Sequence, residues 1–101
     1  VRAVHPPDEL LPAAYELAAE IASSTSAVSL TLTRAMLWRM LGASHPIEAH
    51  RVDSAFIDEL GRGTDVREGV ASFLDKRAPA FPGRVPADLT SSYPWWEEPA
   101  F

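Results

Sequence analysis

The sequence predicts an all-α fold of four helices followed by an extended tail. Apolar residues recur at spacings of three and four in four stretches, which is the pattern of helices with one buried face. Short segments rich in Ser, Gly or Pro interrupt the pattern between these stretches. The chain after residue 78 is rich in proline, which excludes a regular helix there. The prolines are Pro79, Pro82, Pro86, Pro94 and Pro99.

The first predicted helix spans residues 8–22. Glu9, Glu16 and Glu20 lie opposite an apolar stripe. The stripe comprises Leu10 or Leu11, Ala14, Leu17, Ala18 and Ile21. Pro12 fits this helix only within the first turn, where its missing N–H has no partner to lose. His5, which precedes Pro6, is interpreted as a turn residue.

The second predicted helix spans residues 27–41, with Ser26 as its N-cap. Few polar residues interrupt its apolar sequence, chiefly Thr31, Thr33, Arg34 and Arg39. A helix that is apolar on nearly all sides has to be covered on nearly all sides. It is also shorter than the roughly 20 residues that cross a bilayer. We therefore expect it to pack against another subunit or against a part of the protein upstream of this chain.

The third predicted helix spans residues 46–60. Gly42 is a natural end for the helix before it, and Ser44 or His45, followed by Pro46, begins the new one. Its apolar face carries Ile47, Ala49, Val52, Phe56 and Leu60. The segment from Gly61 to Gly63 ends it.

The fourth predicted helix spans residues 65–77. Asp65 and Glu68 have the spacing of a capping box, in which the Asp65 carboxylate accepts a backbone N–H and Glu68 reaches back. Lys76 and Arg77 are expected in the last turn, where cations favour the helix dipole, and Pro79 stops the helix. The apolar face carries Val66, Val70, Phe73 and Leu74.

The tail, residues 79–101, combines prolines with aromatic side chains at Phe81, Tyr93, Trp95, Trp96 and Phe101. Residues 93–96 fit two interpretations: an exposed recognition motif, or an aromatic clasp laid on the protein's own surface. We favour the clasp, because burying two tryptophans is worth several kcal/mol at roughly 25 cal/mol per Å² of apolar area. The spacing of Pro79 and Pro82 also fits the loosest polyproline ligand pattern, which is common by chance.

Composition excludes some classes of partner. The net charge is −5 and no basic cluster exceeds Lys76 and Arg77, so we expect neither nucleic acid nor an anionic membrane as a partner. The sequence has no cysteine, which excludes disulfides and is compatible with the cytoplasm, and we expect a cytoplasmic protein. No apolar run is long enough for a membrane span.

No catalytic constellation is visible in the sequence. His50 and Asp53 share a helix face but lack further ligands, so we expect no metal site. The serines of residues 23–29 lack a neighbouring base, and capping is the better interpretation. From these residues alone we infer a docking helix and assign no catalysed reaction.

Residues 65–81 read D-V-R-E-G-V-A-S-F-L-D-K-R-A-P-A-F. This stretch resembles the C-terminal signature of the enoyl-CoA hydratase/isomerase (crotonase) superfamily, usually written D-x-x-E-G-x-x-A-F-x-E-K-R-x-P-x-F. Residues 1–10 and 18–33 are also similar to the segments that precede it in the family. Asp75 for Glu, Ser72 for Ala and Arg34 for Lys are mild departures.

The resemblance implies that residues 1–78 form the four-helix C-terminal oligomerisation subdomain of a crotonase-like protein, followed by the tail of residues 79–101. In that family these helices cover the acyl-CoA site and build a trimer or a dimer of trimers. The oxyanion hole and the catalytic carboxylates belong to an N-terminal core that this sequence lacks, so we expect the chain to be inactive alone. The intact parent would hydrate or isomerise 2-enoyl-CoA thioesters in fatty-acid metabolism, with acyl-CoA as substrate and no covalently bound cofactor.

Three residues become candidate contacts to the coenzyme A nucleotide by the same resemblance. Lys76 matches a lysine that can lie near the phosphates, and Phe73 would pack beneath it. Ile57 falls near a position where relatives place an aromatic ring against the adenine. The alternative, from a different class, is an autonomous helical interaction module that binds a protein through its second helix or through Trp95 and Trp96.

Overall fold

The computed structural model describes residues 1–98 and 100. Its helices are α1 (Pro7–Ser24), α2 (Ala27–Arg39), the short 3₁₀ helix η1 (Met40–Gly42), α3 (Pro46–Leu60) and α4 (Thr64–Asp75). The described residues contain no strand, so the predicted all-α fold with four main helices is confirmed. After α4 the described part of the tail is non-helical.

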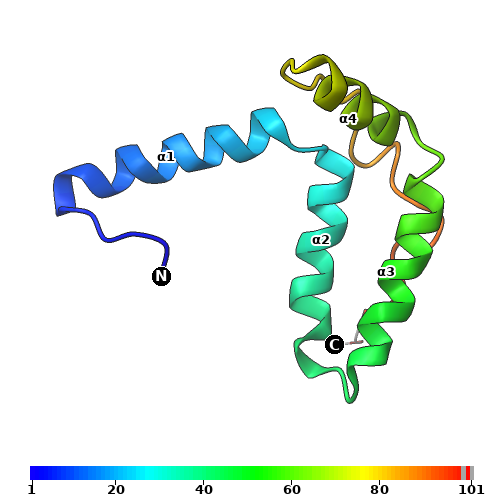
Figure 1. The fold of residues 1–101 in the computed structure, drawn as a ribbon. Coiled ribbons are helices and arrows are strands. Elements are labelled where there is room, and N and C mark those ends of the chain that lie inside the picture. Colours follow the sequence, from blue (N-terminus) through cyan, green and yellow to red (C-terminus); the bar gives the residue numbers. More distant parts are fainter. Residues whose placement is uncertain (99, 101) are drawn as a thin grey trace.

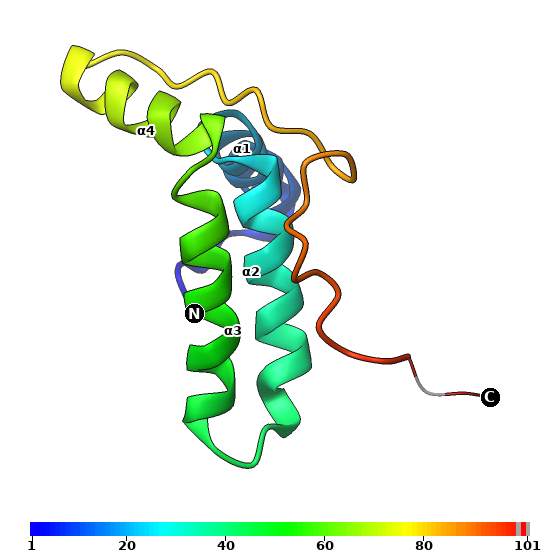
Figure 2. The ribbon, with the colours of Figure 1, turned by 90° about the vertical axis from the view of Figure 1, so that its right-hand side faces the viewer.

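The helices form an open arrangement. Helices α2 and α3 run side by side as an antiparallel hairpin, α4 lies across one end of it, and α1 projects away as an arm (Figure 1). The tail turns back after α4 and descends along the hairpin of α2 and α3 (Figure 2), in contact with both helices. The radius of gyration is 16.5 Å, against about 13 Å for a compact domain of this length. Much of the helical surface is therefore not covered by the chain itself.

Helix α1 differs from the prediction at its start. It begins at Pro7, with Pro6 as the N-cap, so Pro12 lies inside the helix and not in its first turn. Pro12 has no N–H for the carbonyl of Asp8, which it would face in a regular helix. Because α1 is exposed along its length and buries none of its residues, that carbonyl is within reach of water.

The ends of α2 and α3 are set by local capping. Ser26 caps α2 as predicted: its Oγ accepts a hydrogen bond of 3.2 Å from the backbone N–H of Ser29. The predicted end at residue 41 is wrong, because the last turn tightens into η1 after Arg39. Helix α3 has the predicted bounds, and His45 caps it through Nδ1, which accepts from the N–H of Ile47 at 3.1 Å.

A small core lies between α2 and α3. Among the described residues, three hydrophobic side chains are buried, Val28, Leu32 and Phe56. The partly buried side chains around them come from the hairpin and from the tail: Met36, Val52, Leu60, Leu89, Tyr93 and Trp95. The tail therefore completes the core that the hairpin begins.

The predicted aromatic clasp is confirmed, and it comprises Tyr93, Trp95 and Trp96. The Trp95 ring meets Phe56 edge to face at 5.5 Å between centroids. Trp96 lies under the guanidinium of Arg39 at 4.3 Å, and Glu98 accepts hydrogen bonds of 2.5 Å from Arg39 and 2.6 Å from the Trp96 Nε1–H. Of the predicted tail residues, Pro99 and Phe101 lie outside the described residues.

All four main helices expose large apolar side chains, and those of α2 and α1 bear on the expected cover. On α2 and η1, Leu37, Trp38 and Leu41 are 68%, 65% and 76% exposed. On α1 the exposed set is Leu10, Leu11, Tyr15 and Ile21. Exposed apolar patches of this kind mark interaction surfaces in proteins. Within the described residues the expected cover for the second helix is thus missing at Leu37, Trp38 and Leu41.

Candidate functional site

Helix α4 begins differently from the predicted capping box. The N-cap is Gly63, without a side-chain cap, and Asp65 lies inside the first turn. The Asp65 carboxylate accepts hydrogen bonds from Ser26 Oγ at 2.5 Å and from the N–H of Gly83 at 2.8 Å. The predicted capping role of Asp65 is therefore wrong. Its two oxygens instead join the N-cap of α2 to the tail.

The contact leaves no room for a side chain at residue 83. A Cβ added at residue 83 would lie 2.9 Å from both Cγ and Oδ1 of Asp65 and closer still to Oδ2. Real Cβ atoms essentially never show such distances, so any other residue at position 83 would force the Asp65 carboxylate out of its present position. The sequence motif ends two residues earlier, at Phe81, and the role of Gly83 is not visible in it.

Glu68 does not reach back to the start of the helix, because its carboxylate is occupied elsewhere. It accepts two hydrogen bonds from the Arg77 guanidinium, from Nη1 to Oε1 at 2.6 Å and from Nη2 to Oε2 at 2.8 Å. The backbone N–H of Ala80 donates a third, at 2.6 Å to Oε1. Paired charges in this bidentate geometry make strong hydrogen bonds.

These contacts stabilise the charged form of Glu68. The Arg77 guanidinium, followed by the Ala80 N–H, lowers the pKa of Glu68 from 4.5 to about 2. The side chain of Glu68 is 17% exposed, and that of Arg77 is 43% exposed. The pair therefore joins a partly shielded carboxylate on α4 to the chain that follows the helix.

The end of α4 also corrects the sequence prediction. The helix stops at Asp75, and Lys76 is its C-cap in the left-handed conformation, with φ 54° and ψ 37°. The N–H of Arg77 donates to the carbonyl of Ser72 at 3.1 Å, as in helix ends closed by a left-handed residue. Neither Lys76 nor Arg77 lies in the last turn of the helix. Among the described residues, Lys76 is the one non-glycine residue with positive φ.

The structure brings two of the three candidate coenzyme A contacts together. Lys76 Nζ lies 4.4 Å from the centroid of the Phe73 ring, and that ring is 70% exposed. Ile57 lies on α3 and is 63% exposed. Both ribbon views place the end of α4 that carries Lys76 away from α3 (Figure 2). The binding role of all three residues remains a prediction.

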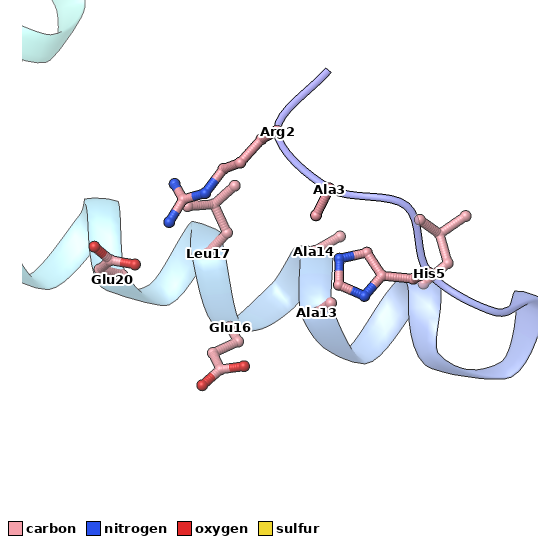
Figure 3. A pocket seen from close by; sticks show the side chains of 9 residues that line it. Arg2, Ala3, His5, Ala13, Ala14, Glu16, Leu17 and Glu20 are labelled. Atoms are coloured by element: carbon pink, nitrogen blue, oxygen red, sulfur yellow. The ribbon is translucent and has the colours of Figure 1, made fainter.

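A pocket of about 510 Å³ lies elsewhere, between the N-terminal segment and α1. Arg2 and His5 point from that segment towards α1, whose side of the pocket carries Glu16 and Glu20 (Figure 3). The remaining lining is largely Ala and Leu, with no nucleophile beside a base. Across the described part of the chain, no three His, Cys, Asp or Glu side chains are grouped to hold a metal ion.

No helix within residues 1–98 and 100 combines the length and the apolar character needed to cross a bilayer.

Comparison with known proteins gives three informative similarities. The chain is 41% identical over 78 residues to "Enoyl-CoA hydratase ACTT3" of Alternaria alternata, covering 77% of this chain and 26% of that protein. It is 42% identical over 71 residues to "Enoyl-CoA hydratase AKT3-2" of the same organism, covering 70% and 23%. It is 38% identical over 68 residues to "Probable enoyl-CoA hydratase" of Rhodobacter capsulatus, covering 66% and 25%.

The chain thus spans about a quarter of the length of the curated relatives it matches. No family model matches it. The similarity covers most of this chain in each case, and the signature of residues 65–81 is built as a connected unit around α4. The chain therefore belongs to the enoyl-CoA hydratase/isomerase (crotonase) superfamily, of which it represents a C-terminal portion.

Proposed function

We propose that this chain is the helical part of a longer crotonase-family protein that holds the assembly together and covers the acyl-CoA site. The observation that carries the proposal is the exposed apolar surface of α2 and η1, where Leu37, Trp38 and Leu41 are each at least 65% exposed. An apolar surface of this kind needs a cover, either the N-terminal core of the parent or a second subunit. The exposed stripe of α1 supports the same conclusion.

The parent would hydrate or isomerise a 2-enoyl-CoA thioester; the two named relatives from Alternaria alternata are enoyl-CoA hydratases by name, and isomerisation rests on the family resemblance. By family resemblance it would act in fatty-acid metabolism, with acyl-CoA as substrate and no covalently bound cofactor, and the absence of cysteine is compatible with a place in the cytoplasm. In that proposal the core supplies two backbone N–H groups that stabilise the developing thioester enolate, an electrostatic effect that is large in enzymes. The chain alone would be inactive.

The end of α4 is the part of this chain that we propose to meet coenzyme A. The Lys76 ammonium offers a point charge for a phosphate group. The exposed Phe73 ring beside it offers an apolar face. Ile57, on α3, would contribute a second apolar contact only if another subunit brought a nucleotide to it.

The alternative of an autonomous interaction module has less support. Its tail version needs Trp95 and Trp96 free for a partner, whereas both belong to the aromatic clasp on this chain's own surface. The version that uses α2 keeps its surface, since Leu37 and Trp38 are exposed. The two proposals differ in what covers α2: parts of a crotonase assembly or an unrelated protein.

Complementation tests the proposal. The 101-residue chain alone should not hydrate crotonyl-CoA, whereas mixing it with the separately produced remainder of the parent should restore hydration. Leu37→Glu should prevent that restoration, because it places a charge on the surface to be covered. Val85→Glu is the matched control, since Val85 is an exposed apolar residue of the tail. Turnover by the chain alone, or restoration by the Leu37 variant equal to that of the control, would contradict the proposal.

A further inference from the structure

Lys76 has an unusual backbone for its residue type. A lysine with φ 54° and ψ 37° occupies a conformation that glycine adopts at little cost and that other residues rarely adopt. Such conformations persist where the surroundings hold them, and they cluster at functional sites.

Besides the backbone hydrogen bond from the Arg77 N–H to Ser72, the contacts of the chain that follows Lys76 converge on one carboxylate. Arg77, the next residue, binds both oxygens of Glu68, and Ala80 donates its N–H to the same group at 2.6 Å. The Arg77 guanidinium also forms an ion pair with the Asp75 carboxylate, with 3.5 Å between Nε and Oδ2. The chain is thus pinned back against the middle of α4 immediately after it reverses at Lys76.

This reversal decides where the ammonium lies. With the backbone turned at residue 76, the side chain runs back over the last turn of α4, and Nζ comes to 4.4 Å from the Phe73 centroid. Both side chains remain open to a ligand, since Phe73 is 70% exposed and Lys76 is exposed. An exposed cation on an exposed ring gains little in water, so stability of the helix end alone does not require this pairing.

We infer that Glu68 is a positioning residue: through Arg77 and Ala80 it holds Lys76 in the left-handed conformation that places its ammonium over Phe73, ready for a phosphate group of the substrate. The inference rests on the proposed contact between Lys76 and coenzyme A. Glu68 itself touches no substrate, because its oxygens are occupied by Arg77 and Ala80.

The kinetic test uses the full-length protein that contains this chain, with crotonyl-CoA as substrate. Glu68→Gln should raise KM about fivefold with kcat little changed, as expected for loss of uniform binding. Lys76→Ala should raise KM by at least as much, and adding Glu68→Gln to Lys76→Ala should raise it no further, because residues acting through one contact are not additive. The matched control is Glu98→Gln, which removes the ion pair with Arg39 on the aromatic clasp and should leave KM unchanged.

A second measurement reads the position of Lys76 without any ligand. In NMR spectra of the 101-residue chain, the ring current of Phe73 should shift the ε-methylene protons of Lys76 upfield. Glu68→Gln should remove that shift, and Glu98→Gln should keep it. If Glu68→Gln does not fold, Glu68→Asp serves in both measurements, since its shorter side chain cannot reach Arg77 and Ala80 together.

The outcomes separate the two ideas. If Glu68→Gln raises KM equally with and without Lys76, or leaves the ε-methylene shift in place, Glu68 does not position Lys76 and the inference is overturned. If Lys76→Ala leaves KM unchanged, the proposed coenzyme A contact fails, while loss of the shift in Glu68→Gln still supports the positioning.

Discussion

Glu68 and Arg77 are nine residues apart in the chain and are joined by two parallel hydrogen bonds of 2.6 and 2.8 Å. The pair closes a loop around the end of α4 that contains Phe73 and Lys76. It therefore links the stability of the helix end to the position of the residues we propose to meet the substrate. The residues that follow, Pro79 to Gly83, run on from this closed loop to Asp65.

The stability of the chain should fall in acid through Glu68. The folded state lowers the pKa of Glu68 to about 2 from an ordinary 4.5, so the unfolded state binds the proton more tightly. The stabilisation is fully present above pH 4.5 and is lost as the pH falls towards 2. Urea denaturation at pH 7 and at pH 2.5 measures it: Glu68→Gln should destabilise the chain clearly at pH 7 and much less at pH 2.5.

The control for this experiment is Asp58→Asn. Asp58 pairs with Arg62 one helical turn away at 2.7 Å, with both side chains more than 60% exposed. Exposed ion pairs of this kind contribute little to the free energy of unfolding. Asp58→Asn should therefore be as stable as the wild type at both pH values. A difference between Glu68→Gln and wild type that is the same at pH 7 and pH 2.5 would exclude the Glu68 carboxylate as its source.

Gly83→Ala should destabilise the chain by about 1–3 kcal/mol, the usual range for overpacking. Its Cβ would overlap the Asp65 carboxylate, and relieving the overlap would break the contact between Asp65 and the N–H of residue 83. Gly42→Ala is the matched variant, because a Cβ there meets nothing within 4 Å. Thermal or urea unfolding should separate the two. Equal stability of both variants would show that the tail does not approach Asp65 in solution.

Lys76→Gly should be more stable than Lys76→Ala by about 1 kcal/mol. Both variants lose the ammonium over Phe73, but alanine keeps the cost of the left-handed conformation whereas glycine relieves it. In the full-length protein the two variants should raise KM for acyl-CoA to the same extent. Unfolding midpoints and steady-state kinetics measured on the same pair thus separate the backbone from the side chain. An alanine variant as stable as the glycine variant would contradict the left-handed end of α4.

Trp95→Ala should cost about 2–3 kcal/mol, less than a fully buried tryptophan because Trp95 is only partly buried. It removes the edge-to-face contact with Phe56 and opens one side of the core. Trp38→Ala, on the exposed side of α2, should change the stability of the isolated chain by no more than about 0.5 kcal/mol. Sedimentation should instead show weaker self-association for the Trp38 variant. A large loss of stability in Trp38→Ala with little change in Trp95→Ala would contradict this packing of the core.

Local patterns were sufficient for the helices whose ends depend on neighbouring residues. The bounds of α3 and the cap by Ser26 follow from residues within one turn, and both were predicted correctly. The end of α4 was not predicted correctly. The chain reverses at Lys76 and Arg77 pairs with Glu68, and helical periodicity does not indicate such a contact. Asp65 was misassigned for the same reason: its partners, Ser26 and Gly83, lie 39 and 18 residues away.

The sequence by itself determined the class of the fold, the family and the surface that needs a cover, since periodicity, a spaced signature and apolar content are properties of the chain as written. Only the tertiary structure decided what the signature residues do. Asp65 and Glu68 have the spacing of a capping box, but hydrogen bonds from the tail and from Arg77 occupy their carboxylates. A carboxylate accepts from whichever donors the fold brings within reach, and here those donors come from the N-cap of α2 and from the chain that follows α4.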